Sequence, residues 1–260
     1  QNPDLCVHNC FGDVYPYSLC PSQPEVRAYV TGLIDDVCGQ FGPQRIVLEA
    51  VGYLGLRHGV HHELAMTPWD DRLELLTGIC FCPACTAAGE GAGIDVHELE
   101  ARVRHLGSAL LNEEDAGLDP EHESAESLRD AVPQLGEYLH CRESAVSGLV
   151  AAAASAAHTK GARVETIAAS FHRPASRAWL EGADVSGIAS SSDAIFLPTY
   201  TGEPAEIASD IAWTRDRCGR TPISTALLAC APTCTGRENL AQQAHTARRA
   251  GAQAIYYYNY

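Results

Sequence analysis

The sequence predicts an α/β fold built around a parallel sheet. Short apolar runs rich in β-branched residues recur along the 260 residues, and each is followed by a stretch with helical periodicity. The runs are continuously apolar rather than alternating, which is typical of strands buried on both faces of a parallel sheet. The last three begin about one strand–helix unit apart. Six runs are visible, at residues 5–8, 46–49, 164–169, 194–197, 223–228 and 254–258.

Two architectures accommodate six parallel strands. A closed (β/α)8 TIM-barrel-like fold needs eight strands, so the chain would start near the third strand, and two strand–helix units would precede it or come from another chain. Residues 1–260 would then form a single barrel-like domain. An open, doubly wound sheet would be complete with six strands, but no glycine-rich phosphate loop follows the first run. The start at Gln1 rather than Met also favours missing upstream residues.

Helix signals lie between these runs. Ser22 and Glu25 have the spacing of a capping box, with a proline in the first turn, and Thr235 and Glu238 repeat that spacing. Apolar residues at helical spacing predict a long helix at about 135–159. Each of these helices can pack on a sheet.

Charge and hydropathy exclude several classes of partner. The chain has 18 Lys and Arg against 33 Asp and Glu, a formal charge of −15, so its surface repels nucleic-acid phosphates and anionic lipid. No apolar run reaches the roughly 18–20 residues that a bilayer requires. We therefore expect neither nucleic acid nor a membrane as a partner, and the sequence leaves a homo-oligomer open.

The cysteine count indicates the compartment. Eleven cysteines are an odd number, which fits a disulfide framework badly, and a chain of this size does not need one. The better interpretation is a reducing, cytoplasmic environment in which some thiolates bind metal.

Three of the cysteines form a compact array. Cys80, Cys82 and Cys85 follow one another within six residues, which is tight enough to wrap one tetrahedral ion. Cys20 is the best candidate for the fourth ligand, because a fully thiolate-ligated zinc ion would tie down a long loop; the alternatives are Cys38 and Cys10. The array lies in a stretch without clear periodicity at about 50–95, which we expect to be a zinc-binding insertion loop.

The order of these motifs resembles a known family. Residues 20–27, Cys-Pro-Ser-Gln-Pro-Glu-Val-Arg, precede a predicted helix, the strand at 46–49, His58 and the cysteine array at 80–85. Over about residues 10–90 this arrangement is similar to the middle of family 42 β-galactosidases. More broadly, it resembles barrel proteins labelled glycoside-hydrolase-like.

The resemblance implies a fold, a cofactor and a catalytic residue. In that family a Cys-Pro before a helix joins the Cys-x-Cys-x-x-Cys loop on one zinc ion, and the strand between them ends in the acid/base glutamate. It therefore implies a (β/α)8 barrel with Glu49 as general acid/base. Two departures are visible: Leu48 stands where the family has Asn, and no acid follows the run at 223–228, where the family has its nucleophile. The implied ligands of a structural zinc are Cys20, Cys80, Cys82 and Cys85.

The carboxyl ends of barrel strands form the active face. Glu49 follows three apolar residues of a strand expected to be buried, where a carboxylate costs several kcal/mol unless it is paired, so acid/base catalysis or pairing with loop amides or an arginine must explain it. A second carboxylate is needed roughly 5–5.5 Å away in a retaining glycosidase and roughly 6.5–9.5 Å away in an inverting one, and Asp13 and Glu203 are candidates. The other polar residues at strand ends are Asn9, Ser170, His172, Tyr200, Cys230 and Asn259.

A histidine cluster follows Glu49. Imidazoles with a carboxylate suit a catalytic metal, but they could equally bind substrate hydroxyls or form a solvated patch. The closing tyrosines at 256–260 alternate across a strand, so some belong to the core and one could stack under a sugar ring. The cluster consists of His58, His61, His62 and Glu63.

Three functional hypotheses follow. The leading one is a glycoside-hydrolase-like enzyme for a carbohydrate or another polyhydroxylated small molecule, with Glu49 as general acid/base and Asp13 beside it. The second is a metal-dependent barrel lyase or isomerase that uses Glu49 and residues 58–63. The third is a non-catalytic carbohydrate-binding relative. Under the leading hypothesis, the substrate contacts are His58, His62, His172, Tyr200 and Asn259.

Overall fold

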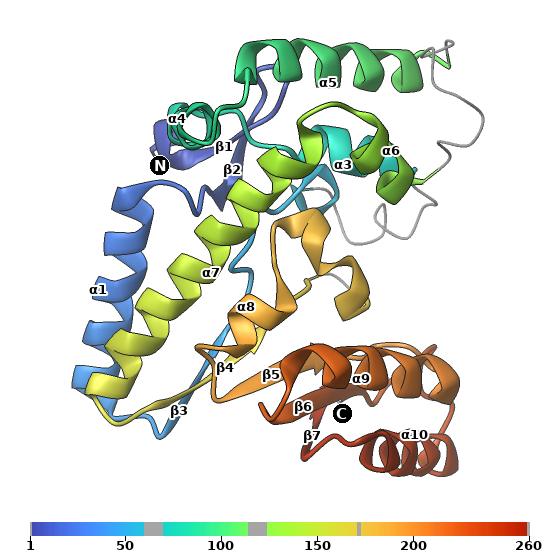
Figure 1. The fold of residues 1–260 in the computed structure, drawn as a ribbon. Coiled ribbons are helices and arrows are strands. Elements are labelled where there is room, and N and C mark those ends of the chain that lie inside the picture. Colours follow the sequence, from blue (N-terminus) through green and yellow to red (C-terminus); the bar gives the residue numbers. More distant parts are fainter. Residues whose placement is uncertain (1, 60–69, 114–123, 171–172, 259–260) are drawn as a thin grey trace. The chain divides into compact units, whose positions relative to one another are not determined.

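A computed structural model describes residues 2–59, 70–113, 124–170 and 173–258. The chain divides into two compact units (Figure 1). The first comprises residues 1–28, 52–145 and 180–182, and the second comprises residues 29–51, 146–179 and 183–260. The single barrel-like domain over the whole chain stays a prediction.

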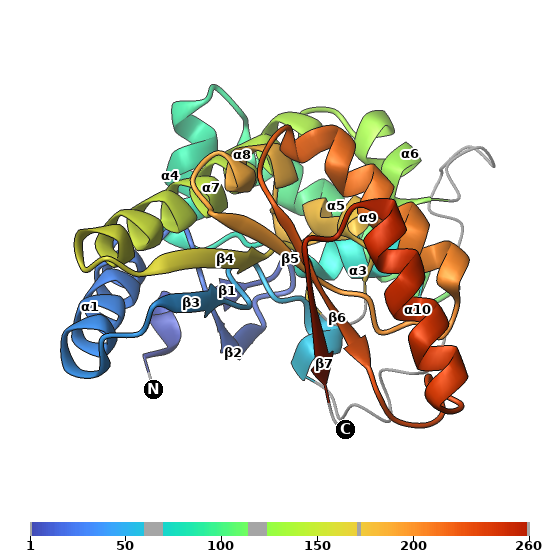
Figure 2. The same cartoon turned by 90° about the horizontal axis from the view of Figure 1, so that it is seen from below.

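The second unit is built on a curved parallel sheet. Within the described residues this sheet has five strands, in the same order as they occur in the sequence (Figure 2). This confirms the predicted α/β class with a parallel, TIM-barrel-like sheet, which forms a half-barrel. The strands are β3 (Arg45–Leu48), β4 (Arg163–Ile167), β5 (Ala194–Pro198), β6 (Ile223–Leu228) and β7 (Ala254–Tyr258).

Helices follow the strands, as the sequence predicted. The expected long helix is confirmed as α7 (Leu135–Thr159), and α1 (Pro24–Phe41) begins at the proline of the first predicted cap. The other helices of this unit are α8 (Val185–Ala189), α9 (Pro204–Cys218) and α10 (Arg237–Ala250), and a 3₁₀ helix spans Ala175–Glu181. The prediction of a capping box at Thr235 is wrong, because the N-cap residue of α10 is Gly236, which makes no side-chain hydrogen bond to the helix.

One face of the sheet packs on helices. The parts of α1 and α7 that belong to this unit cover β3 and β4, and Ile46 and Leu48 contact their core from β3. Small side chains on α7 allow its backbone to approach the sheet closely. The buried residues of this cluster are Ile34, Cys38, Ala153, Ala154, Ala157, Ala162 and Val164.

The other face carries a polar network that shows the curvature of the sheet. Arg45 on β3 forms an ion pair with the buried Glu165 on β4 at 2.6 Å, and its Nη1 donates to the hydroxyl of Tyr256 on β7 at 2.6 Å. β3 and β7 are the two edges of the sheet, which would lie roughly 19 Å apart if the sheet were flat. A single arginine bridges these edges because the sheet is curled into a half-barrel.

The first unit contains a separate hairpin. β1 (Cys6–His8) pairs antiparallel with β2 (Val14–Leu19), so the expectation that residues 5–8 form a strand of the parallel sheet is wrong, and five rather than six predicted runs lie in that sheet. Asn9 explains the difference. Its Oδ1 accepts hydrogen bonds from the backbone N–H groups of Phe11 and Asp13, at 2.9 Å each, and reverses the chain directly after β1.

Helices complete this unit. The stretch at 50–95, expected as a loop, contains a 3₁₀ helix and two α-helices among its described residues. Asp70 caps the first α-helix by accepting from the Arg72 N–H at 2.8 Å, and Pro83 starts the second. None of the helices in the described ranges has the length and apolarity needed to cross a bilayer. The helices are α3 (Asp71–Gly78), α4 (Pro83–Gly91), α5 (Val96–Leu111) and α6 (Ala125–Ala131), with 3₁₀ helices at Pro3–Leu5 and Leu56–Gly59.

Candidate functional site

The four predicted zinc ligands meet in the first unit. The Sγ atoms of Cys20, Cys80, Cys82 and Cys85 all lie within 4.8 Å of one another, and all four residues are buried. The Sγ of Cys20 lies 3.5 Å from those of Cys82 and Cys85 and 3.9 Å from that of Cys80. A tetrahedral zinc ion with Zn–S bonds of about 2.3 Å requires Sγ–Sγ edges of about 3.8 Å. The donor set and its spacing therefore fit a structural zinc ion.

Backbone hydrogen bonds hold these cysteines in place. The hairpin carries Cys20, whose N–H donates to the Leu5 carbonyl at 2.8 Å. The loop before α4 is tied to the same hairpin, because Phe81 N–H donates to the His8 carbonyl at 2.7 Å and His8 N–H donates to the Cys80 Sγ at 3.4 Å. Cys10, an alternative ligand in the sequence, instead directs its thiol to the Leu76 carbonyl.

The electrostatics of the cluster favour a bound cation. Burial raises the pKa of the Cys80 thiol well above its ordinary value, so four thiolates at this place require compensating positive charge. Arg142, only 2% exposed, places its guanidinium 4.4 Å from the centre of the Tyr53 ring, and the Tyr53 hydroxyl lies 3.8 Å from the Cys85 Sγ. Because four sulfur ligands leave no open coordination position, the cluster suits a structural role rather than a catalytic one.

A second group of residues gathers at the carboxyl edge of the half-barrel. Glu49 directly follows β3, Tyr200 follows β5, and Tyr258 ends β7. The rings of Tyr200 and Tyr258 are stacked, with centroids 5.5 Å apart. The pKa of Tyr200 is raised, first by burial and then by Tyr258 and the negative charge of Glu49. Glu49 therefore lies within electrostatic reach of this pair.

The predicted burial of Glu49 is wrong. In the part of the chain that the structure describes, β3 has a neighbouring strand on one side only, so its residues alternate between exposed and half-buried, and Glu49 itself is exposed. The backbone after it turns sharply, since Ala50 has a φ of 56°, in the left-handed region that residues with a Cβ rarely adopt. An exposed carboxylate is accessible to a ligand. Because water solvates it, its negative charge carries only a small desolvation cost.

Two predicted residues lie in the first unit. Asp13 is exposed in the turn between β1 and β2, where its Oδ2 accepts a hydrogen bond from the Asn9 side chain at 3.0 Å. The expectation that Asp13 follows a parallel strand is therefore wrong. His58 lies on the 3₁₀ helix Leu56–Gly59, with its ring 6.1 Å from that of Tyr17.

Several predicted positions lie outside the described residues, and one is an exposed helix N-cap. His62 and its neighbours His61 and Glu63, together with His172 and Asn259, are outside the described residues. Glu203 is exposed at the N-cap of α9. The roles predicted for these residues stay predictions.

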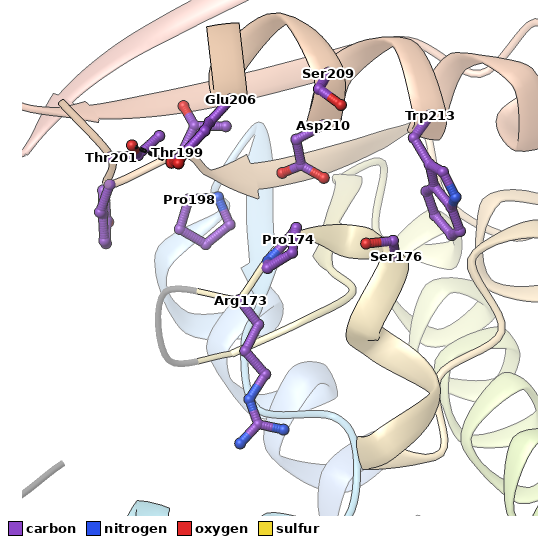
Figure 3. A pocket seen from close by; sticks show the side chains of 11 residues that line it. Arg173, Pro174, Ser176, Pro198, Thr199, Thr201, Glu206, Ser209, Asp210 and Trp213 are labelled. Carbon is purple, nitrogen blue, oxygen red and sulfur yellow. Dashed lines mark hydrogen bonds between the residues drawn. The ribbon is translucent and has the colours of Figure 1, made fainter. Parts of the chain in front are cut away.

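A cavity beside α9 was not predicted from the sequence. Its volume is about 430 Å³, and its lining comes from the end of β5, the first turns of α9 and residues 173–176 (Figure 3). Asp210 on α9 lines it and accepts a hydrogen bond from the Ala175 N–H at 2.8 Å. Burial raises the pKa of Asp210 to about 6. The sequence did carry a signal, because Asp210 interrupts the buried stripe of α9 formed by Ile207, Ile211 and Thr214.

The described structure also resembles solved proteins. The chain superposes on the catalytic domain of β-amylase from Paenibacillus polymyxa with a TM-score of 0.60 and 11% identity, covering 99% of this chain and 68% of that one. It superposes on β-galactosidase from the psychrophilic Marinomonas ef1 with a TM-score of 0.60 and 12% identity, covering 98% of this chain and 41% of that one.

These comparisons define a class of fold. At such low identities they show that the chain has the architecture of glycoside-hydrolase barrel domains, with a partial barrel. The chain spans about two fifths of the length of the β-galactosidase. No family model and no curated protein matches it.

Proposed function

We propose that this protein is a glycoside-hydrolase-like enzyme that acts on a carbohydrate or another polyhydroxylated small molecule at the carboxyl edge of β3–β7. The observation that carries this proposal is the position of Glu49 at the end of a parallel strand, close to the Tyr200–Tyr258 pair. Enzymes with barrels of this kind hold their catalytic residues at this edge. The likeness to barrel domains of a β-amylase and a β-galactosidase supports the same class of substrate.

In this proposal Glu49 is the general acid/base. Its carboxyl group is exposed and can exchange a proton with the glycosidic oxygen and with water. The tyrosine pair offers an aromatic face for the C–H groups of a sugar ring, and Tyr258 is 53% exposed. Burial raises the pKa of Tyr200 above its ordinary value, and its ring forms one side of this aromatic face.

Several further assignments belong to the proposal. His58, His62, His172 and Asn259 are proposed substrate contacts, and Glu203 is a candidate for the second carboxylate. Asp13, the other predicted catalytic residue, lies in the β1–β2 turn, and its role stays a prediction. The four-cysteine cluster would hold one structural zinc ion. All eleven cysteines lie in described parts of the chain and none of them forms a disulfide, which supports a reducing compartment such as the cytoplasm.

One observation favours a second candidate function. Residues 229–233, which follow β6, are Ala-Cys-Ala-Pro-Thr and contain no acid, although the family resemblance expects a nucleophile after this strand. A non-catalytic carbohydrate-binding protein would not need that carboxylate. The metal-dependent lyase or isomerase depends on residues 58–63, most of which lie outside the described residues.

A screen with nitrophenyl glycosides separates these functions. We expect the wild-type protein to hydrolyse at least one substrate, and Glu49→Gln to lower kcat by about 100-fold or more. Glu238→Gln is the matched control, since Glu238 is exposed in the first turn of α10. Binding of a sugar without turnover would instead support the non-catalytic relative.

A further inference from the structure

We propose that the cavity beside α9 is a second sugar-binding subsite, which holds a non-reacting ring of an oligosaccharide. This inference depends on the proposed function, because it places the reacting ring beside Glu49. A second subsite implies that the substrate is at least a disaccharide, rather than a single sugar with a small leaving group.

The first argument is the placement of Asp210. Its side chain projects from the buried stripe of α9 toward Pro174 and Ser176, on the wall of the cavity (Figure 3). The backbone N–H of Ala175 donates to its Oδ1. In the described parts of the chain no cation pairs with this carboxylate. A partly buried carboxylate with acceptor capacity left over suits a ligand that brings hydrogen-bond donors.

The second argument is the chemistry of the surrounding walls. Trp213, one turn beyond Asp210, and Tyr200 provide aromatic surface, while Ser176 and Thr199 add hydroxyl groups. A carboxylate between aromatic rings and hydroxyl groups matches a sugar ring, which presents C–H groups on its faces and hydroxyl groups at its rim. Arg173 and Pro174 also line the cavity.

The third argument is continuity with the Glu49 site. Tyr200 lines this cavity, and the same side chain stacks on Tyr258 and is within electrostatic reach of Glu49. The Tyr200 side chain is therefore shared by the cavity beside α9 and the Glu49 site. The volume of about 430 Å³ falls within the range of small-molecule sites. A ligand that passes over Tyr200 would put one ring near Glu49 and another near Asp210.

Calorimetric titration with defined sugars tests the subsite. The probes are maltotriose and β-1,4-galactotriose, an α-linked and a β-linked trisaccharide, compared with glucose and galactose. We expect at least one trisaccharide to bind the wild-type protein about tenfold or more tightly than its monosaccharide. Asp210→Asn and Trp213→Phe should each weaken trisaccharide binding about tenfold and leave monosaccharide binding within about twofold.

Control variants keep the result interpretable. Asp216→Asn changes an exposed acid on the same helix, and Trp179→Phe changes a tryptophan outside the cavity lining; both should bind like the wild type. Circular dichroism and thermal melting verify that each variant is folded. Because Trp213→Phe is conservative in size, it provides a second measurement if Asp210→Asn is unstable.

Three results would overturn the subsite: neither trisaccharide binds, each binds no better than its monosaccharide, or both cavity variants retain wild-type affinity. A failure of the proposed function has a different signature. If Glu49→Gln left hydrolysis unchanged while the cavity variants still lost trisaccharide affinity, the catalytic assignment would fall and the subsite would stand.

Discussion

The rings of Tyr200 and Tyr258 stack with centroids 5.5 Å apart and planes inclined by 21°, although β6 lies between the strands that carry them. The contact forms because the sheet curls and brings the carboxyl ends of β5 and β7 toward each other. At the opposite end of the same face, Arg45 bridges β3 and β7 through the Tyr256 hydroxyl. The half-barrel therefore has a polar network near its amino end and an aromatic pair at its carboxyl end.

The first prediction concerns the metal. We expect about one zinc ion per chain, and Cys85→Ser should abolish stoichiometric binding and lower the melting temperature by about 10 °C or more, because metal binding contributes folding free energy. Elemental analysis and thermal denaturation measure both effects. Cys141→Ser is the control, since Cys141 lies outside the cluster. A Cys85→Ser variant with full zinc content would disprove the ligand set.

The second prediction concerns Arg142. Its Nη2 donates to the carbonyl oxygens of Gly78 and Leu180, at 3.0 and 3.4 Å, while its Nε and Nη1 are buried and have no hydrogen-bond partner among the described residues. Arg142→Met should lower the free energy of unfolding by about 2–4 kcal/mol, because two buried carbonyls lose their donor, and should weaken zinc retention against a chelator. Urea denaturation measures the first effect.

Arg102→Met is the matched control for that experiment, because Arg102 is exposed on α5. It should change the free energy of unfolding by less than about 0.5 kcal/mol. If Arg142→Met behaved like this control, the buried guanidinium would have no role in holding the first unit together.

The third prediction concerns pH and Asp210. Burial raises its pKa from 3.8 to about 6 in the folded protein, so the folded state binds this proton more tightly than the unfolded state does. This contribution to stability is fully present below about pH 4 and is lost as the pH rises through about 6. Asp210→Asn removes this pH-dependent part of the free energy of unfolding. That part is at most about 3 kcal/mol, and solvent screening makes it smaller.

Urea denaturation at pH 4, 5 and 7 measures this contribution to the free energy of unfolding. Relative to the wild type, Asp210→Asn should become more stable as the pH rises, whereas Asp216→Asn should show no such trend. A difference between Asp210→Asn and the wild type that stays constant with pH would mean that the carboxyl is not buried as described.

Some of this structure was predictable from sequence because the signals are local. Cys80, Cys82 and Cys85 lie close together in any conformation, and Cys20 came from its place before a predicted helix and from the family resemblance. The five parallel strands were recognisable as continuous apolar runs. The kind of sheet to which residues 5–8 belong was not predictable, because so short an apolar run has the same pattern in a parallel and in an antiparallel sheet. The side chain of Asn9 decides where the chain reverses.

The remaining features depend on tertiary structure. The exposure of Glu49 follows from the position of β3 at an edge of the sheet, which its own sequence does not encode. The cavity at Asp210 forms where α9 meets residues 173–176, and the helix pattern shows only that an acid lies on the buried stripe.

The dependence of hydrolysis on the leaving group tests the central claim about Glu49 most directly. A general acid matters most when the departing oxygen is basic. We predict that Glu49→Gln lowers kcat/KM by about 100-fold or more for aryl glycosides with poor leaving groups and by less than about tenfold for dinitrophenyl glycosides. A uniform loss across the series, or none, would contradict the assignment of Glu49 as the proton donor.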